Sequence, residues 1–350
     1  MRPSIDRSES TESKSLQSNT NPPEQNSLNS RIERVLADSL KRKLSSDVNA
    51  AWQIMHAVIC YGDDLKIVVN DESVPALEYL LNGGLVNGFE LRLTDSIVAA
   101  TGRTGVRAKF DPGSYIGQGH VDQWLAILAM ADIPLTRKIT VGDESRTLLD
   151  WARHVQFNVS NNPIDEYSWT LIALTHYFPD EPQWMCDHDV DVNWEMLVEY
   201  ELTYDLEASA CGGTHRLAGI VNALEAKQRL ALPDSAIWNE ARDRVTKMIE
   251  IVEQQRSPDG TLSAYYFFQP GSTRDLFAQL SSTGHLFEFL ALACDAEKLK
   301  EPWIETSANR LCELIELTSA EDLDCGALYH ALHGLKVYQQ RRSSSTAQTP

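Results

Sequence analysis

The chain has 350 residues, of which 43% are hydrophobic and 23% charged, the balance of an ordinary globular protein. Its 50 acidic and 31 basic residues give a formal charge of −19, which repels phosphate backbones and anionic lipid headgroups. We therefore expect no binding to nucleic acid. The sequence has no apolar run long enough to cross a bilayer and no signal-peptide pattern in residues 1–10, so we expect a cytoplasmic protein without membrane insertion.

Composition divides the chain into a central region and two polar ends. Residues 1–30 are rich in Ser, Asn, Glu, Pro and Thr, and residues 341–350 have the same character, so we expect both ends to be disordered. Residues 31–340 are expected to form a single domain. The six cysteines include no C-x-x-C pair, so we expect reduced thiols, no metal ion and no other cofactor.

Helical segments of two alternating kinds follow one another along this domain. Amphipathic segments, which have one apolar stripe, occupy residues 31–44, 73–81, 146–159, 193–207, 235–255 and 302–317. Segments that are apolar nearly all round occupy residues 50–62, 120–131, 167–178, 215–224, 285–294 and 327–335. A helix without a polar face must be surrounded by protein. The alternation therefore predicts six buried helices, each paired with a half-exposed one.

Two Gly-containing segments, 85–105 and 259–272, interrupt this pattern with strand-like sequence. Six helical hairpins with two short β-hairpin-like insertions predict an all-α fold, an (α/α)6 toroid in which inner helices line the axis and outer helices wrap them. The alternative is an open α-solenoid built from the same hairpins. A solenoid needs a polar concave face, which these apolar helices do not offer.

Several of the buried segments begin with small residues beside a histidine. His120 lies in GQGHVDQW, His215 in CGGTHRL and His285 in SSTGHLFEF. In a toroid all inner helices begin at the same end, where their positive dipoles favour an anionic or polar group. The sequence thus predicts a binding site at one mouth of the barrel for a small polar or anionic ligand or a peptide end, formed by His120, Glu166, His215, Arg216 and His285.

Three stretches carry a resemblance to known proteins: CGGTHRLAGIVNAL (211–224), QQRSPDG (254–260) and STRDLFAQLSSTGHLFEFL (272–290). They resemble the helix openings and Q-x-x-x-D-G turns of the α/α-toroid superfamily of prenyltransferase β subunits and terpenoid cyclases. Together with MHAVICYG (55–62), the pattern is similar to an uncharacterised bacterial family of planctomycete type. The resemblance implies the toroid fold. It does not imply the chemistry, because the Asp-x-Cys zinc ligands and the acidic motifs of those enzymes are missing from the matching region.

Asp122, Glu166, His215 and His285 are the candidate catalytic residues. Asp122 and Glu166, at the starts of the second and third inner helices, have the character of the carboxylate pair in carbohydrate-active hydrolases, lyases and epimerases, or they complement the helix dipoles. The histidines are general bases, metal ligands or groups that fix how the hairpins join. Three functions stay open: a binding protein, a carbohydrate-active enzyme, and a prenyltransferase- or cyclase-like enzyme without the usual motifs.

Overall fold

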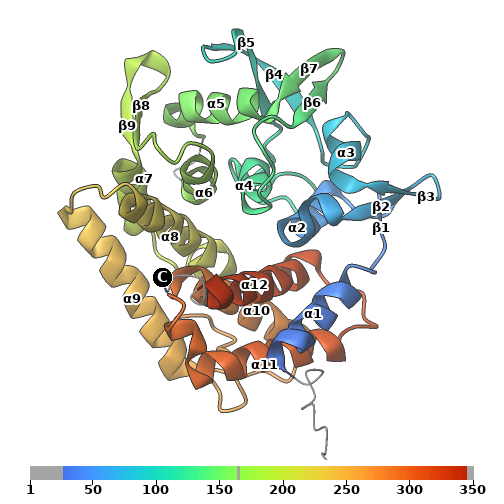
Figure 1. The fold of residues 1–350 in the computed structure, drawn as a ribbon, viewed down its shortest axis with the longest axis vertical. Coiled ribbons are helices and arrows are strands. Elements are labelled where there is room, and N and C mark those ends of the chain that lie inside the picture. The colour runs from blue at the N-terminus through green and yellow to red at the C-terminus, as the bar shows by residue number, and fades with distance from the viewer. Residues whose placement is uncertain (1–26, 164–165, 345–350) are drawn as a thin grey trace, which may run out of the picture.

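The computed structural model describes residues 27–163 and 166–344, which form twelve α-helices and nine short strands (Figure 1). The protein is mostly α-helical, as predicted. The apolar segments are α2 (Ala51–Tyr61), α4 (Gln123–Met130), α6 (Ser168–Tyr177), α8 (Thr214–Arg229), α10 (Leu276–Ala293) and α12 (Cys325–Ser344). The amphipathic segments are α1 (Leu28–Ser39), α3 (Ala76–Leu81), α5 (Leu148–Asn158), α7 (Trp194–Thr203), α9 (Ala236–Gln255) and α11 (Pro302–Leu317).

The six apolar helices contact one another in cyclic order. Helix α2 contacts α4, the contacts continue through α6, α8, α10 and α12, and α12 returns to α2. We call these six the ring helices. The amphipathic helices lie outside them, with α9 and α11 along one edge and α5 and α7 along another (Figure 1). Enclosure on all sides explains the composition of the ring helices, since every residue of α4 from Gln123 to Ala129 is buried.

Short antiparallel hairpins lead into three of the outer helices. They are β2 (Lys66–Val69) with β3 (Glu72–Pro75), β6 (Lys138–Val141) with β7 (Glu144–Thr147), and β8 (Gln183–Met185) with β9 (Asp191–Asn193). β1 (Leu44–Ser45) pairs with β2. Each hairpin is closed at the helix by the same kind of bond, in which the first helical residue donates its N–H to a carbonyl just before the first strand. Hairpin and outer helix therefore form a repeated local unit.

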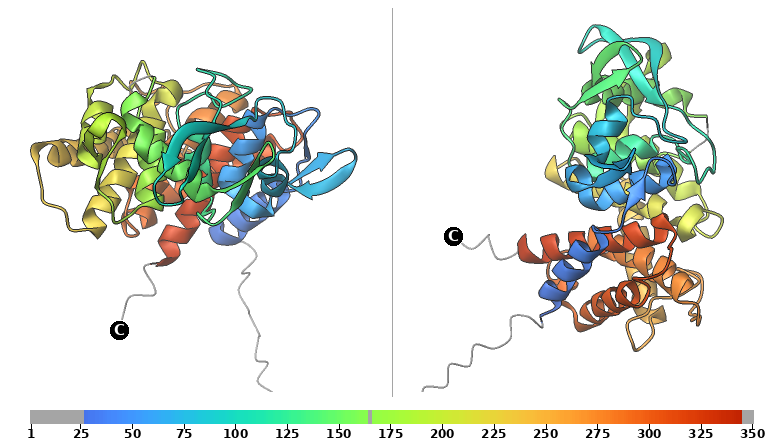
Figure 2. Two further views of the ribbon diagram at one scale, coloured as in Figure 1. Left: turned by 90° about the horizontal axis from the view of Figure 1, so that it is seen from above. Right: turned by 90° about the vertical axis from the view of Figure 1, so that its right-hand side faces the viewer.

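The two predicted β insertions have different outcomes. Segment 85–105 contains β4 (Leu91–Val98), which pairs with β5 (Arg103–Ala108) beside α5 at one edge of the molecule (Figures 1 and 2). Segment 259–272 contains no strand, so the prediction of a β insertion there was wrong. Its polar groups bond locally instead, because Gly260 turns at φ +89° and the Ser263 hydroxyl donates to the Gln269 carbonyl.

The ends of the domain extend beyond the predicted limits of 31 and 340. Helix α1 begins at Leu28 because the Ser27 hydroxyl caps it by accepting from Ser30 N–H, and α12 continues to Ser344. The rest of the two predicted tails, 1–26 and 345–350, lies outside the described residues. Among the residues that are described, no helix combines the length and apolar composition needed to cross a membrane.

Substitution of Gly219, in α8, tests how closely α8 packs against α6. A Cβ added at Gly219 would lie 2.7 Å from Ser168 Cα and 2.8 Å from its carbonyl oxygen. We expect Gly219→Ala to lower the free energy of unfolding by about 1 to 3 kcal/mol, because overpacking outweighs the better helix propensity of alanine. Chemical denaturation measures the change. The exposed Gln228→Ala in the same helix is the control, expected within about 0.5 kcal/mol of wild type. Equal stability of both variants would contradict the close approach.

Candidate functional site

Five histidines from different parts of the chain lie together inside the ring. His56 belongs to α2, His215 to α8, His285 to α10 and His330 to α12, while His120 precedes α4. Ring centroids are 4.5 Å apart for His285 and His330, 5.1 Å for His215 and His330, 5.3 Å for His56 and His330, and 5.9 Å for His120 and His215. We call these five residues the histidine cluster.

Trp169 of α6 completes the cluster, with its ring centroid 4.8 Å from that of His215 and 5.9 Å from that of His120. Every ring helix, or the turn before it, thus contributes an aromatic side chain. All of these residues except His120 are buried. At this level the interior of the ring is filled by side chains.

Burial decides the charge of several of these imidazoles. It lowers the pKa of His56 to about 3, with His330 adding a smaller effect, and it holds the pKa of His215 well below its usual range, assisted by His330 and His285. His215 is therefore neutral, yet both of its ring nitrogens are buried without a hydrogen-bond partner, as are His330 Nε2 and Trp169 Nε1. Buried polar atoms normally have partners, so these atoms point to one that the polypeptide does not supply.

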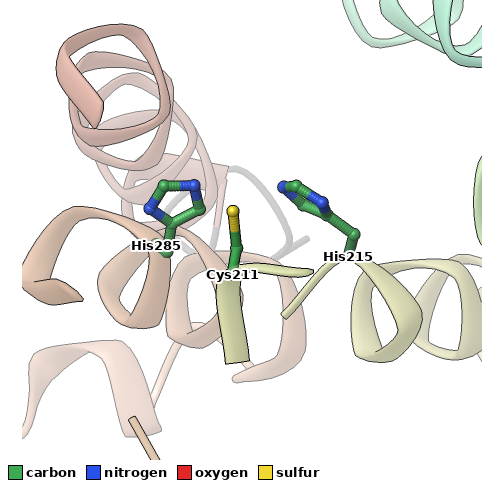
Figure 3. Close-up of side chains that lie close together, drawn as sticks. All are labelled: Cys211, His215 and His285. Atoms are coloured by element: carbon green, nitrogen blue, oxygen red, sulfur yellow. The ribbon is translucent and has the colours of Figure 1, made fainter. Parts of the chain in front are cut away.

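Cys211 lies between His215 and His285 (Figure 3). It belongs to a short 3₁₀ segment, Ala210–Gly213, that leads directly into α8. The Cys211 sulfur and one ring nitrogen of each histidine lie within 4.8 Å of one another. A thiol with two imidazoles is a donor set that suits a transition-metal ion.

The position of His285 differs from the prediction. Helix α10 begins at Leu276, where the Asp275 carboxylate caps it by accepting from Phe277 N–H, so His285 lies in the middle of the helix, and its placement in the first turn was wrong. The polar sequence between Gln279 and Gly284 obscured the true start. Burial disfavours the charged form of His285, but the neighbouring Cys211 sulfur outweighs this effect and raises the pKa of His285 to about 9.

Glu288 is buried in α10 between two histidines of α12. Its Oε2 lies 2.7 Å from His330 Nδ1 and its Oε1 lies 2.6 Å from His333 Nδ1. Burial alone would raise the pKa of Glu288, but the two histidines hold it well below its usual range. Each histidine can donate its Nδ1 proton to the carboxylate, which leaves Nε2 of His330 as an acceptor inside the cluster. This carboxylate therefore fixes the orientation of the His330 ring.

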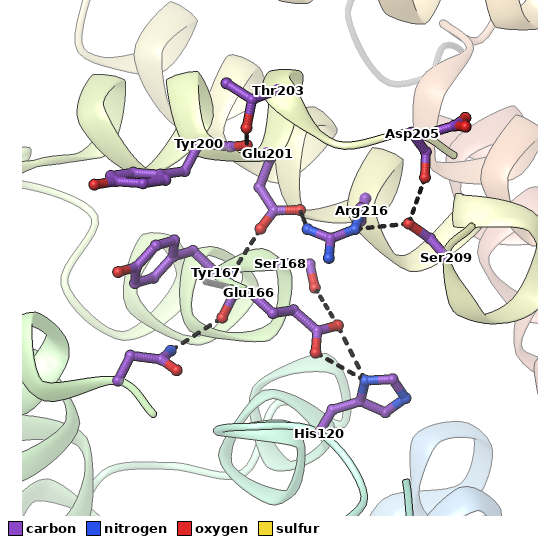
Figure 4. Close-up of polar contacts among 11 residues, drawn as sticks. His120, Glu166, Tyr167, Ser168, Tyr200, Glu201, Thr203, Asp205, Ser209 and Arg216 are labelled. Atoms are coloured by element: carbon purple, nitrogen blue, oxygen red, sulfur yellow. Dashed lines mark hydrogen bonds and ion pairs between the residues drawn. The ribbon is translucent and has the colours of Figure 1, made fainter. Parts of the chain in front are cut away.

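Four of the predicted ligand-binding residues form a continuous series of contacts. His120 Nδ1 lies 3.0 Å from both carboxylate oxygens of Glu166 (Figure 4). His120 also contacts His215, which contacts His285. Asp165, next to Glu166, lies outside the described residues.

Arg216 faces a different set of groups. Its Nη1 donates to Glu201 Oε2 at 2.9 Å and its Nε donates to Ser209 Oγ at 2.9 Å (Figure 4). Its guanidinium lies 4.0 Å from the Tyr204 ring centroid. Glu201 also accepts from Tyr167 N–H. Arg216 thus connects α8 to α7 and, through Glu201, to the start of α6, and it is separate from the histidine cluster.

Asp122 belongs to a cavity outside the cluster. The cavity has a volume of about 440 Å³ and lies between the β4–β5 hairpin, α5 and the turn before α4. Its wall includes three basic side chains, Arg92, Arg107 and Lys109. Burial raises the pKa of Asp122 to about 6, although the Thr170 hydroxyl donates to its Oδ2 at 2.6 Å. Asp122 and Glu166 therefore have different immediate partners.

No protein-family model, curated protein or solved structure matches the chain. Its function is therefore argued from this geometry.

Cys211, the Glu288 carboxylate and the basic cavity wall were not among the site residues predicted from the sequence. One local signal was available at Cys211, since Cys-Gly-Gly before a helix indicates backbone of positive φ; the angles are +50°, +62° and +79° for Cys211, Gly212 and Gly213. The approach of Cys211 to His285, on a different ring helix, follows only from the tertiary structure.

Asp122→Asn tests the environment of the Asp122 carboxyl. A folded-state pKa of about 6 lies above the ordinary value, so the native state holds the proton more tightly, and the stability this provides is lost as the pH rises from about 4 to about 6. Asparagine tolerates the positive φ of 59° and carries no charge. Relative to wild type, we expect the variant to gain on the order of 1 kcal/mol between pH of about 4 and about 7.

Urea unfolding at several pH values measures this gain. Asp47→Asn, at an exposed position, is the control and should show a pH-independent difference. A flat profile for Asp122→Asn would contradict a raised pKa.

Proposed function

We propose that the protein is an (α/α)6 toroid that binds a small anionic ligand near the end where its ring helices begin. The contact between α12 and α2 supports a closed ring, because an open solenoid would leave its first and last hairpins apart. We propose that the protein resembles prenyltransferase and cyclase toroids in architecture and not in chemistry.

The proposal of anion binding rests on the basic side chains in the wall of the cavity. Arg92, Arg107 and Lys109 gather on the β4–β5 hairpin and the residue after it, in a chain whose formal charge is −19. Glu90 pairs with two of these cations, at 2.6 Å from Arg92 Nε and 3.9 Å from Lys109 Nζ. Arg107 contributes to lowering the pKa of His154 to about 4, although burial of His154 is the larger cause. Cations concentrated at one cavity of an acidic protein favour an anion there.

The rest of the wall limits the ligand to a small organic anion. Trp151 and Val155 supply an apolar side, while Asn158 supplies an amide. A volume of about 440 Å³ lies within the range of small-molecule sites. A carboxylate or phosphate group against the cations, with a compact body against Trp151, matches these features.

Stabilisation by defined anions tests this proposal. We expect citrate, glucuronate or inorganic phosphate to raise the melting temperature of the full chain, since a ligand at about 100 times its Kd stabilises the native state by about 2.7 kcal/mol. Arg107→Gln should abolish this gain while the protein stays folded by circular dichroism. Arg274→Gln, at an exposed position away from the cavity, should retain it. Absence of stabilisation by all three anions, or its retention in Arg107→Gln, would overturn the proposal.

A second candidate function is favoured by Asp122. A carboxyl group with a pKa near 6 on a cavity wall has the property that a general acid needs at neutral pH. The ligand would then be a substrate, and a carbohydrate-active hydrolase, lyase or epimerase acting on an acidic sugar is the matching class. In that case Asp122→Asn would bind glucuronate but fail to convert glucuronate-containing oligosaccharides that the wild type converts.

A further inference from the structure

The residues around Cys211 form a donor set that the proposed anion site does not use. Cys211, His215 and His285 come from the turn before α8, from α8 itself and from α10, and none of them lines the basic cavity. Their donor atoms lie within 4.8 Å of one another, and the two histidines are buried. We infer that Cys211 Sγ and ring nitrogens of His215 and His285 bind a Zn²⁺ ion inside the ring, a function beyond anion binding and independent of it.

The spacing of the three atoms fits one ion. Zn–S and Zn–N bonds of about 2.3 and 2.0 to 2.1 Å in a tetrahedron place neighbouring donor atoms roughly 3.3 to 3.6 Å apart. The observed limit of 4.8 Å is wider by about one ångström. The inference requires the three side chains to rotate toward the ion by that amount. One thiolate with two imidazoles selects zinc over the oxygen-seeking ions magnesium and calcium.

His285 has the hydrogen bond of a metal ligand, and His215 has nitrogens that no protein group uses. His285 Nδ1 lies 2.7 Å from the Ser281 carbonyl oxygen, to which it donates, and the other nitrogen gains a lone pair for an ion when it gives up its proton. His215 has no hydrogen-bond partner on either nitrogen although the residue is only 8% exposed. A buried imidazole without a partner costs stability, and a bound ion would remove that cost for one nitrogen.

The backbone before α8 holds the sulfur in place in a conformation that only certain residues allow. A Cβ added at Gly212 would lie 2.3 Å from Cγ of Tyr266, and one added at Gly213 would lie 2.5 Å from a methyl carbon of Leu206. Both glycines and Cys211 itself have positive φ. Strained backbone of this kind is retained where it positions a functional group. Here it presents Cys211 between the two histidines (Figure 3).

Three protein ligands leave one tetrahedral position free, as in catalytic rather than structural zinc sites. The nearest unused donor is His330, whose ring centroid lies 4.5 Å from that of His285 and whose Nε2 is buried without a partner. The Glu288 carboxylate orients this ring through Nδ1. His330 is therefore placed to accept a hydrogen bond from a molecule that occupies the free position.

Metal binding is measured on the full chain after chelation and dialysis against Zn²⁺, with bound metal counted by elemental analysis. We expect one Zn²⁺ per chain, together with release of the protons that the Cys211 sulfur and the His285 ring hold before the Zn–S and Zn–N bonds form. Replacement by Co²⁺ should give the intense visible bands of a tetrahedral site and a sulfur-to-metal charge-transfer band.

Matched variants assign the ligands. Cys211→Ser should remove the charge-transfer band and weaken zinc binding by more than about 100-fold, because loss of a group that only orients a ligand weakens binding by up to about 100-fold. His285→Ala should also weaken zinc binding strongly. Cys186→Ser and His188→Ala should bind as wild type, since Cys186 donates only to the Gln156 carbonyl and His188 is exposed. Circular dichroism confirms that each variant is folded.

Wild-type protein that retains no zinc, or zinc retained equally by Cys211→Ser, would overturn the inference. The test of the anion site is independent of the test of the zinc site. If Arg107→Gln loses stabilisation by citrate but still binds zinc, both sites are supported. If the wild type binds zinc but no anion stabilises it, the metal site is supported and the anion proposal fails.

Discussion

The structure depends on one constraint, the absence of a polar face on the six ring helices. Such helices can be stable in water only when protein surrounds them, and cyclic contact with two neighbours and an outer helix achieves this. Helices α10 and α12 also approach closely, because a Cβ at Gly284 would meet the Ala331 side chain at 2.8 Å and one at Gly334 would meet Glu288 Cα at 2.9 Å. Small residues at these crossings let the ring close without voids.

Enclosure also determines the chemistry inside the ring. Histidines that face inward from several helices lose contact with water, and this keeps His56 and His215 neutral. The Glu288 carboxylate is retained there because His330 and His333 both bind it. Positive charge is found instead at the edge of the molecule, on the β4–β5 hairpin. The protein thus separates an interior of histidines, one cysteine and one paired carboxylate from a basic cavity suited to anions.

The sequence predicted which segments form helices better than it predicted which side chains of different helices come into contact. Apolar and amphipathic helices alternate visibly because burial and half-exposure leave different patterns along the chain, and α11 has the predicted limits of 302–317. The start of α10 was misplaced because Ser282, Thr283 and Gly284, in the middle of the helix, resemble the capping residues of a helix start. The pairing of Cys211 with His285 could not be predicted, since it depends on how two helices of the ring lie against each other. The strand pattern in 259–272 was overridden by local side-chain and backbone bonds.

Closure of the ring has a consequence for the order in which the chain can fold. Helix α2 is synthesised long before α12, one of its two ring neighbours. Helix α1 likewise precedes α11 and α12, on which it packs, and its Arg31 pairs with Glu316. Until α12 has been made, one apolar flank of α2 lacks its ring neighbour, and contacts so distant in sequence form slowly. A nascent chain of this design therefore exposes apolar surface until its later helices are made, and such surface is what chaperones bind.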